Sequence, residues 1–194
     1  MRKKSFSSYQ WVLPLAAGLG AVWVLNKRRM GLSGKVVLVT GASRGLGLAI
    51  AQEFAKRGAR LAICSRSVQE IEAAALEFDA ETEVLPLACD VTQQKEVDDT
   101  VRHVVNYYGT IDVLINNAGV IQVAPVGKTV VEDYEEAMKT HFWGPLYTTL
   151  AALPTMQRRG SGRIVNIASL GGKISLPHLL AYSASKFALV YASK

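Results

Sequence analysis

Tyr182 and Lys186 are the two residues of this sequence whose types and spacing most directly indicate proton-transfer chemistry. They stand four positions apart, and because positions i and i+4 of a helix share one face, the Lys186 ammonium is expected beside the Tyr182 ring. A nearby cation favours the phenolate that forms when a tyrosine gives up its proton. Ser169 stands thirteen residues before this pair. The pattern indicates general acid/base catalysis.

A glycine-rich turn, Thr40-Gly41-Ala42-Ser43-Arg44-Gly45-Leu46-Gly47, directly follows an apolar run. Glycines let the backbone approach a diphosphate closely, and the N-terminus of the following helix offers unpaired N–H groups and a partial positive charge. Three glycines in eight residues also fit a simple tight turn. The position of the turn between a strand and a helix favours a dinucleotide-binding site.

Two arginines indicate which nicotinamide dinucleotide is bound. Arg44 lies inside the glycine turn and Arg66 follows the second predicted strand, where an adenosine 2′-phosphate is expected. The acid that would hold a free 2′-hydroxyl is absent from this strand end, where Cys64 and Ser65 stand instead. Because a guanidinium group suits a phosphate, the sequence favours NADP(H), with NAD(H) as the second choice.

The elements that must position these residues alternate between short β-branched runs and longer helical patterns. This alternation predicts a parallel sheet, and strands that are apolar throughout indicate helices on both of its faces. We therefore predict a Rossmann-like, doubly wound α/β fold. Five strands are expected at residues 35–40, 60–65, 82–90, 112–116 and 163–168, and helices at 46–58, 67–78, 94–109, 132–156 and from 182 onward.

The order and spacing of the motifs resemble the short-chain dehydrogenase/reductase (SDR) family. The resemblance runs from about residue 35 to residue 189 and rests on residues 40–47, Asp90, Asn116-Asn117-Ala118-Gly119, Ser169, Tyr182 and Lys186. It implies an oxidoreductase that moves a hydride between a nicotinamide and a hydroxyl or carbonyl group. It also implies a sheet that usually has seven strands, of which five are predicted here.

The same resemblance implies roles for single residues. Tyr182 would protonate the carbonyl oxygen, Ser169 would hold that oxygen, and Lys186 would also contact the nicotinamide ribose. Asp90 would bind the adenine, whereas Asn116 is also a candidate for bracing the sheet. The expected cofactor-binding residues are Gly41, Ser43, Arg44, Gly45, Leu46, Gly47, Arg66, Asp90, Val91, Asn117, Ala118, Gly119, Tyr182 and Lys186.

One departure from the family pattern lies in the helix before the fifth strand. SDR enzymes usually carry an asparagine there that is thought to hold a water of the proton relay, but this sequence has His141-Phe142-Trp143-Gly144. A histidine also holds a water and titrates near neutral pH, or it packs there without a catalytic part. The sequence leaves both readings open, and His141 is counted among the candidate catalytic residues.

A second departure concerns length. SDR enzymes usually continue past the Tyr/Lys helix with two further strands and a segment that covers the substrate, whereas this sequence ends eight residues after Lys186. We therefore expect an NAD(P)-binding Rossmann domain over residues 31–194 that is incomplete at its C-terminus, with an unpaired edge at the fifth strand. The alternative to an enzyme is a catalytically inactive, membrane-held protein that keeps a partial dinucleotide fold for binding or interaction.

Residues 1–30 form a basic and apolar segment before this domain. Residues 11–25 are uncharged and lie between basic clusters at residues 2–4 and 27–29. A membrane span takes about 17–25 residues and the apolar part of a signal peptide about 7–15, so a cleaved signal peptide is the alternative. Flanking aromatic residues and the second basic cluster favour a retained N-terminal apolar helix. We expect membrane association with the catalytic domain in the cytoplasm.

Charge and cysteine content exclude other classes of function. The net charge is +6, but seven of the 22 basic residues occur up to Lys35, which leaves 15 basic against 16 acidic residues. With no basic stripe beyond that point, nucleic acid is not an expected partner. Cys64 and Cys89 lack the nearby partners of a zinc site, so no metal is expected and both are predicted to be buried.

The expected partner is a small alcohol or carbonyl compound. The apolar character of residues 173–180 hints that this substrate is hydrophobic. A homo-oligomer through the two long C-terminal helices is implied by the family resemblance.

Overall fold

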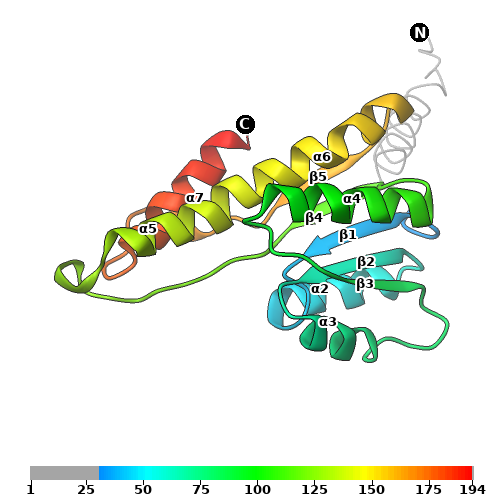
Figure 1. Cartoon of the computed structure of the whole chain (residues 1–194), viewed down its shortest axis with the longest axis horizontal. Coiled ribbons are helices and arrows are strands. Elements are labelled where there is room, and N and C mark those ends of the chain that lie inside the picture. Colours follow the sequence, from blue (N-terminus) through cyan, green and yellow to red (C-terminus); the bar gives the residue numbers. More distant parts are fainter. Residues whose placement is uncertain (1–30, 194) are drawn as a thin grey trace, which may run out of the picture. The chain divides into compact units, whose positions relative to one another are not determined.

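The computed structural model describes residues 31–193, so the membrane anchor expected at residues 11–25 lies outside the described residues. From Leu32 onward the chain forms one compact unit. Five parallel strands make one sheet in the order β3-β2-β1-β4-β5 (Figure 1). The predicted doubly wound α/β fold is confirmed.

The strands and helices agree closely with the predicted segments. The strands are β1 (Val36–Thr40), β2 (Arg60–Ser65), β3 (Val84–Ala88), β4 (Val113–Asn116) and β5 (Arg163–Asn166). The helices are α2 (Gly45–Ala55), α3 (Val68–Ala75), α4 (Gln94–Tyr108), α5 (Val131–Met138), α6 (Gly144–Arg159) and α7 (Leu180–Ala192), with short turns η1 (Val126–Lys128), η2 (Lys139–Trp143) and η3 (Leu170–Gly172). β3 and β5 are shorter than the runs that predicted them.

The strand order fixes which helices cover which face. From β1 the chain moves outward through β2 to β3, and it then crosses back to continue on the other side of β1 with β4 and β5. Because such crossovers are right-handed, α2 and α3 lie on one face of the sheet and α4 and α6 on the other (Figure 1). The reversal between β1 and β4 is where doubly wound proteins bind their ligands.

Both faces of β1 are fully covered. Val36 and Leu38 belong to a buried cluster that α4 and α6 complete, and this cluster also contains Cys64 and Cys89. Val37 and Val39 point to the opposite face by strand alternation and are also fully buried. Burial of such side chains is the main stabilising contribution to the fold. The prediction that both cysteines are buried is confirmed.

The prediction of a single helix over residues 132–156 is wrong in one respect. It is interrupted by η2, a π-helical turn in which the amide of Gly144 donates to the carbonyl of Lys139, five residues earlier. Pro145 has no amide hydrogen for the carbonyl of His141, so a regular α-helical bond is missing at this point. The turn places His141 in the interior.

The edges of the sheet are β3 and β5. Within residues 31–193, β5 pairs only with β4, and Val165 keeps 41% of its surface exposed. The unpaired edge that the sequence predicts at the fifth strand is therefore present. Over the same residues, no helix combines the length and the apolar character that crossing a bilayer requires.

Asp112 connects three elements at the amino-terminal edge of the sheet. Its carboxylate accepts a hydrogen bond from the Val36 amide at 3.0 Å and pairs with Arg159 at 3.0 Å and Lys35 at 3.4 Å. Burial opposes ionisation of this carboxyl, but the Val36 amide, Arg159 and Lys35 together hold its pKa below the ordinary value. The carboxylate thus ties β1 and α6 to the start of β4.

We predict that Asp112→Asn lowers the free energy of unfolding by about 2 kcal/mol, because charged hydrogen bonds to a buried group are lost. The pKa of Asp112 is lower in the folded than in the unfolded chain, so its contribution is present above pH 4 and is lost as the pH falls through the folded value. The difference in urea stability between the two proteins should therefore be larger at pH 7 than at pH 3. An equal difference at both pH values would contradict this role.

Candidate functional site

The glycine turn after β1 runs close to the turn after β4. Gly41 has φ +64°, and a Cβ atom there would lie 2.7 Å from the Cα of Ala118. At Gly47 a Cβ atom would lie 2.2 Å from the carbonyl oxygen of Gly41. Only glycine fits at either position, so the backbone of Gly41 lies directly against Ala118, and the first N–H groups of α2 remain free of helical partners.

Thr40 and Asn117 hold these two turns together. The Thr40 hydroxyl accepts hydrogen bonds from the amides of Asn117 at 3.0 Å and Ala118 at 3.1 Å. In return the Asn117 side chain donates to the carbonyls of Thr40 and Gly41, both at 3.0 Å. Asn116 braces the same region, because its side chain contacts Thr148 at 2.6 Å and Asn166 at 2.9 Å.

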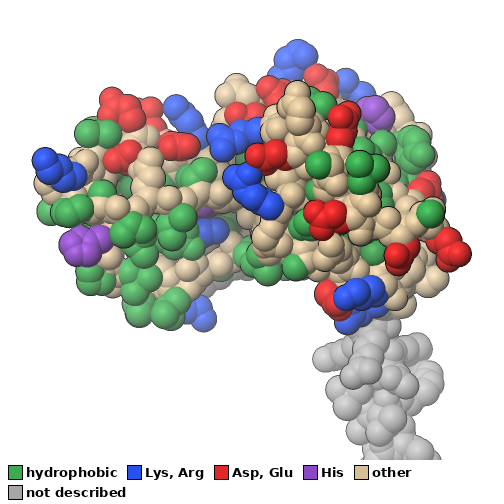
Figure 2. All heavy atoms as spheres, turned by 90° about the horizontal axis from the view of Figure 1, so that it is seen from below, with side chains coloured by type: hydrophobic (Ala, Val, Ile, Leu, Met, Phe, Trp, Pro, Cys, Tyr) green, Lys and Arg blue, Asp and Glu red, His purple; other side chains and the backbone are tan. Residues whose placement is uncertain are grey.

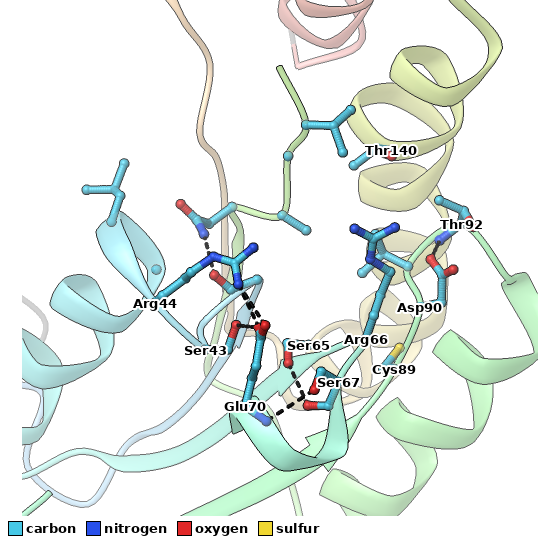
Figure 3. A pocket seen from close by; sticks show the side chains of 18 residues that line it. Ser43, Arg44, Ser65, Arg66, Ser67, Glu70, Cys89, Asp90, Thr92 and Thr140 are labelled. Carbon is cyan, nitrogen blue, oxygen red and sulfur yellow. Dashed lines mark hydrogen bonds and ion pairs between the residues drawn. The ribbon is translucent and has the colours of Figure 1, made fainter. Parts of the chain in front are cut away.

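A pocket of about 380 Å³ opens beside this junction (Figure 3). Most of the predicted cofactor-binding residues line it, namely Gly41, Ser43, Arg44, Leu46, Gly47, Arg66, Asp90, Val91, Asn117, Ala118 and Gly119. Gly45, Tyr182 and Lys186 are not among its lining residues. Other residues also line the pocket although they are not among the predicted cofactor-binding residues; these are Ser65, Ser67, Glu70, Cys89, Thr92, Val120 and Thr140.

The free glycine backbone, the open helix N-terminus and the polar walls of this pocket fit a dinucleotide. At Gly45 (φ +60°) no atom outside the adjoining backbone lies within 4 Å of the place a Cβ would occupy, so this position faces open space. Asp90 is fixed at the far wall, where its carboxylate accepts from the Thr92 amide at 2.9 Å and its amide donates to Glu96 at 2.8 Å.

The two predicted phosphate-binding arginines have different surroundings. One guanidinium nitrogen of Arg44 contacts both carboxylate oxygens of Glu70, at 2.8 and 2.9 Å, and the Ser43 hydroxyl donates to the same carboxylate at 3.1 Å. Arg66 reaches into the pocket from the opposite wall (Figure 3). Among residues 31–193 it forms no ion pair. Nothing in the sequence spacing signalled the Arg44–Glu70 contact.

Two glycines let the turn after Ser169 pack on the helix that carries Tyr182. Ser169 begins η3 and accepts the amide of Gly171 at 3.1 Å. A Cβ atom at Gly171 would lie 3.0 Å from the Tyr182 ring, and one at Gly172 would lie 2.7 Å from the carbonyl oxygen of Lys186. The turn that follows Ser169 therefore packs directly on the helix that carries the predicted Tyr/Lys pair.

Lys186 lies beside Tyr182, as its position one helical turn later predicts. Its ammonium nitrogen is 5.9 Å from the centre of the Tyr182 ring and donates to the carbonyl of Ile167 at 2.8 Å. Only 6% of the residue is exposed, and burial lowers the pKa of its ammonium group to about 8. The cation is therefore held in place, but its charge is less stable than that of a surface lysine.

His141 joins the two halves of the site. The Val120 amide donates to Nε2 at 3.1 Å, Nδ1 lies 2.8 Å from the Ser185 hydroxyl, and that hydroxyl donates to the carbonyl of Tyr182 at 2.8 Å. The rings of His141 and Tyr182 meet edge to face with centres 5.3 Å apart. Burial, with a smaller effect of the Lys186 charge, lowers the pKa of His141 to about 4.

Comparisons with known proteins agree with this arrangement. Residues 35–194 match the family model described as short chain dehydrogenase. The chain is 38% identical over 189 residues to dehydrogenase/reductase SDR family member 7B of Danio rerio, covering 91% of this chain and 61% of that protein. It is 35% identical over 174 residues to estradiol 17-beta-dehydrogenase 11 of Rattus norvegicus, covering 86% and 56%. The chain thus spans little more than half the length of these relatives.

Solved structures show the same similarity in three dimensions. A short-chain dehydrogenase from Streptomyces avermitilis superposes with a TM-score of 0.77 at 37% identity, covering 83% of this chain and 59% of the other. A putative short-chain alcohol dehydrogenase from Sinorhizobium meliloti gives 0.78 at 32% identity, covering 82% and 64%. The sequence match, the fold and the placement of the motifs lead to one conclusion: this chain belongs to the short-chain dehydrogenase family, whose members bind a nicotinamide dinucleotide.

Proposed function

We propose that the protein is an oxidoreductase that transfers a hydride between NADP(H) and a hydroxyl or carbonyl group. The observation that carries this proposal is the packing of the turn after Ser169 on the helix that carries Tyr182 and Lys186, next to the wall of the dinucleotide pocket. His141 connects the two, since it contacts Tyr182 on one side and Val120, which lines the pocket, on the other.

Each reacting group has its own role in the proposed reaction. The Tyr182 hydroxyl gives its proton to the substrate oxygen during reduction, and the Ser169 hydroxyl holds that oxygen by a hydrogen bond. The Lys186 ammonium favours the phenolate that remains on Tyr182. The bound nicotinamide supplies the hydride for reduction and takes it up for oxidation.

The choice of NADP(H) is supported by the pocket wall around the end of β2. Arg44 and Arg66 both line the pocket, and Ser65 stands at the strand end in place of an acid. Arg66 offers a guanidinium group to a 2′-phosphate at this wall, and Arg44 offers a second one that is paired with Glu70. The glycine turn and the N-terminus of α2 suit the pyrophosphate, and Asp90 offers an acceptor for the adenine amino group.

The surface near Tyr182 supports a hydrophobic substrate. The loops at residues 120–126 and 170–178 lie side by side, because the Ala124 amide donates to the carbonyl of His178 at 2.9 Å. In Figure 2, hydrophobic side chains gather over the part of the molecule that holds α5 and α7. The exposed apolar residues of the two loops are Ile121, Val123, Val126, Leu170 and Ile174.

We predict that Tyr182→Phe lowers the rate of NADPH-dependent carbonyl reduction by about a thousandfold, because the proton donor is lost while the ring still packs on Gly171. NADPH binding should change less than twofold. Stopped-flow absorbance at 340 nm with a panel of hydrophobic ketones measures the rate, and fluorescence titration measures binding. Equal turnover by both proteins would contradict the role of Tyr182, and binding without turnover by either would favour the inactive alternative.

We also propose that His141 positions Tyr182 and holds no relay water. The Val120 amide can only donate, so Nε2 carries no hydrogen and Nδ1 must donate to Ser185. Both ring nitrogens are thereby used by the protein. The sequence leaves two roles open for His141, holding a relay water and packing without a catalytic part. This arrangement supports the packing role.

A neutral His141 has consequences for the dependence on pH. With a pKa of about 4, against 6.5 for an ordinary histidine, the ring stays uncharged at neutral pH and becomes protonated only in acid. We predict that nitrogen NMR shows the Nδ1–H form from pH 6 to pH 8, and that the pH–rate profile of His141→Asn keeps its shape in this range. Loss of an ionisation between pH 6 and 7 in the variant would show that His141 belongs to the proton relay.

We further propose that residues 11–25 anchor the protein in a membrane, with the domain on the cytoplasmic side. Support comes from the aromatic and basic residues that flank the apolar run. The full chain should stay in the membrane fraction after alkaline carbonate washing, whereas release into the supernatant would contradict an anchor.

We also propose that the protein assembles into a homo-oligomer through α6 and α7. Leu150, Phe187 and Tyr191 leave large apolar surfaces exposed on these helices.

A further inference from the structure

The local sequence around Glu70 predicts a different hydrogen-bond partner for its side chain from the partners that it has in the structure. Ser67-Val68-Gln69-Glu70 has the spacing of a capping box, in which the serine bonds the amide of the third helical residue and the glutamate reaches back to the serine amide. The first bond is formed, since the Glu70 amide donates to the Ser67 hydroxyl at 3.2 Å. The return bond is not, because the carboxylate of Glu70 contacts Arg44 and Ser43 instead.

Glu70 places a negative charge at the pocket wall where the 2′-phosphate of NADP(H) is proposed to bind. Glu70 lines the same pocket as Arg44 and Arg66, and Figure 3 shows its carboxylate directed at the guanidinium of Arg44. Arg44 is therefore neutralised, while Arg66 has no ion pair within the described part of the chain. Of the two cations expected to meet a 2′-phosphate, one is occupied by an acid of the protein.

This ion pair is easily exchanged. The side chain of Arg44 is 78% exposed and that of Glu70 is 48% exposed, and ion pairs in such contact with water are weak. A phosphate dianion carries more charge than a carboxylate and offers three acceptor oxygens to the guanidinium. In a complete capping box the displaced carboxylate would accept a hydrogen bond from the Ser67 amide.

We infer that Glu70 is a specificity-determining residue, whose carboxylate competes with the 2′-phosphate of the dinucleotide for Arg44. The inference rests on the proposed function, since it concerns the same adenosine end of the pocket. With Glu70 in place, a phosphate must displace an acid before it gains Arg44, and preference for NADP(H) is reduced. A ribose with a free 2′-hydroxyl has no such competitor and meets an acid that can accept a hydrogen bond from it.

The test uses two small probes that need only the adenosine end of the site. Adenosine 2′,5′-bisphosphate carries the 2′-phosphate and adenosine 5′-monophosphate does not. Their dissociation constants are measured by isothermal titration calorimetry on the full chain and on Glu70→Gln, which removes the charge and keeps the shape. We expect the bisphosphate to bind about fivefold more tightly to the variant, the upper range for loss of an exposed ion pair, and the monophosphate to change less than twofold.

A matched control is available on the same helix. Glu72 is exposed, carries the same charge and does not line the pocket, so Glu72→Gln removes an equal charge without freeing Arg44. It should leave both dissociation constants unchanged. In an Arg44→Ala background, Glu70→Gln should no longer favour the bisphosphate, because the group for which the two acids compete is gone.

The outcomes separate this inference from the proposed function. If the wild type binds both probes and Glu70→Gln leaves their ratio unchanged, the competition is refuted while the dinucleotide site stands. The same holds if Glu72→Gln has an equal effect, which would show a general influence of charge. If the wild type binds neither probe, the proposed cofactor site itself is wrong.

Discussion

The structure depends on the close contact between the turn after β1 and the turn after β4. These are neighbouring strands at the point where the strand order reverses, and their ends meet without intervening side chains at Gly41 and Ala118. Four hydrogen bonds cross this contact, and they join Thr40 and Gly41 of the first turn to Asn117 and Ala118 of the second. Because these bonds fix the two ends of the strands to each other, the glycine backbone is held in a fixed shape beside the pocket.

The same contact extends to the helix that carries the reacting residues. Val120 follows the second turn directly, and its amide bonds to His141, whose ring touches Tyr182. The π-helical turn at residues 139–143 is what brings His141 inward to make this connection. Gly171 and Gly172 also position the site, because they let the turn after Ser169 pack on α7. The site is thus built from short loops whose positions are set by glycines and a few buried hydrogen bonds.

Much of this arrangement was predictable from the sequence. Apolar runs of strand length, such as residues 60–65, and the helical period of residues 94–109 follow from burial on a covered sheet, and both agree with β2 and α4. The glycine turn was recognised because its place after a strand restricts its conformation. Helical spacing puts Tyr182 and Lys186 on one face, and their place after Ser169 together with the family resemblance indicates a reacting pair.

Other features depended on contacts that spacing does not encode. The π-helical turn arises from one missing amide at Pro145 together with tertiary packing, and a periodic pattern does not reveal it. Glu70 and Arg44 are 26 positions apart on different elements, and the capping-box pattern even assigned the Glu70 side chain another partner. The partners of His141 likewise became visible only when the loop at Val120 and the helix at Ser185 were placed beside it.

The central claim is that one pocket, at the junction of the turns after β1 and β4, holds the dinucleotide and places it beside Tyr182. Hydrogen exchange followed by mass spectrometry, with and without NADP⁺, tests it most directly. The account predicts slower exchange in the segments at residues 41–48, 116–121 and 180–187, with no change in α4, which contributes no residue to the pocket lining. Protection confined to other segments, or none at saturating NADP⁺, would contradict it.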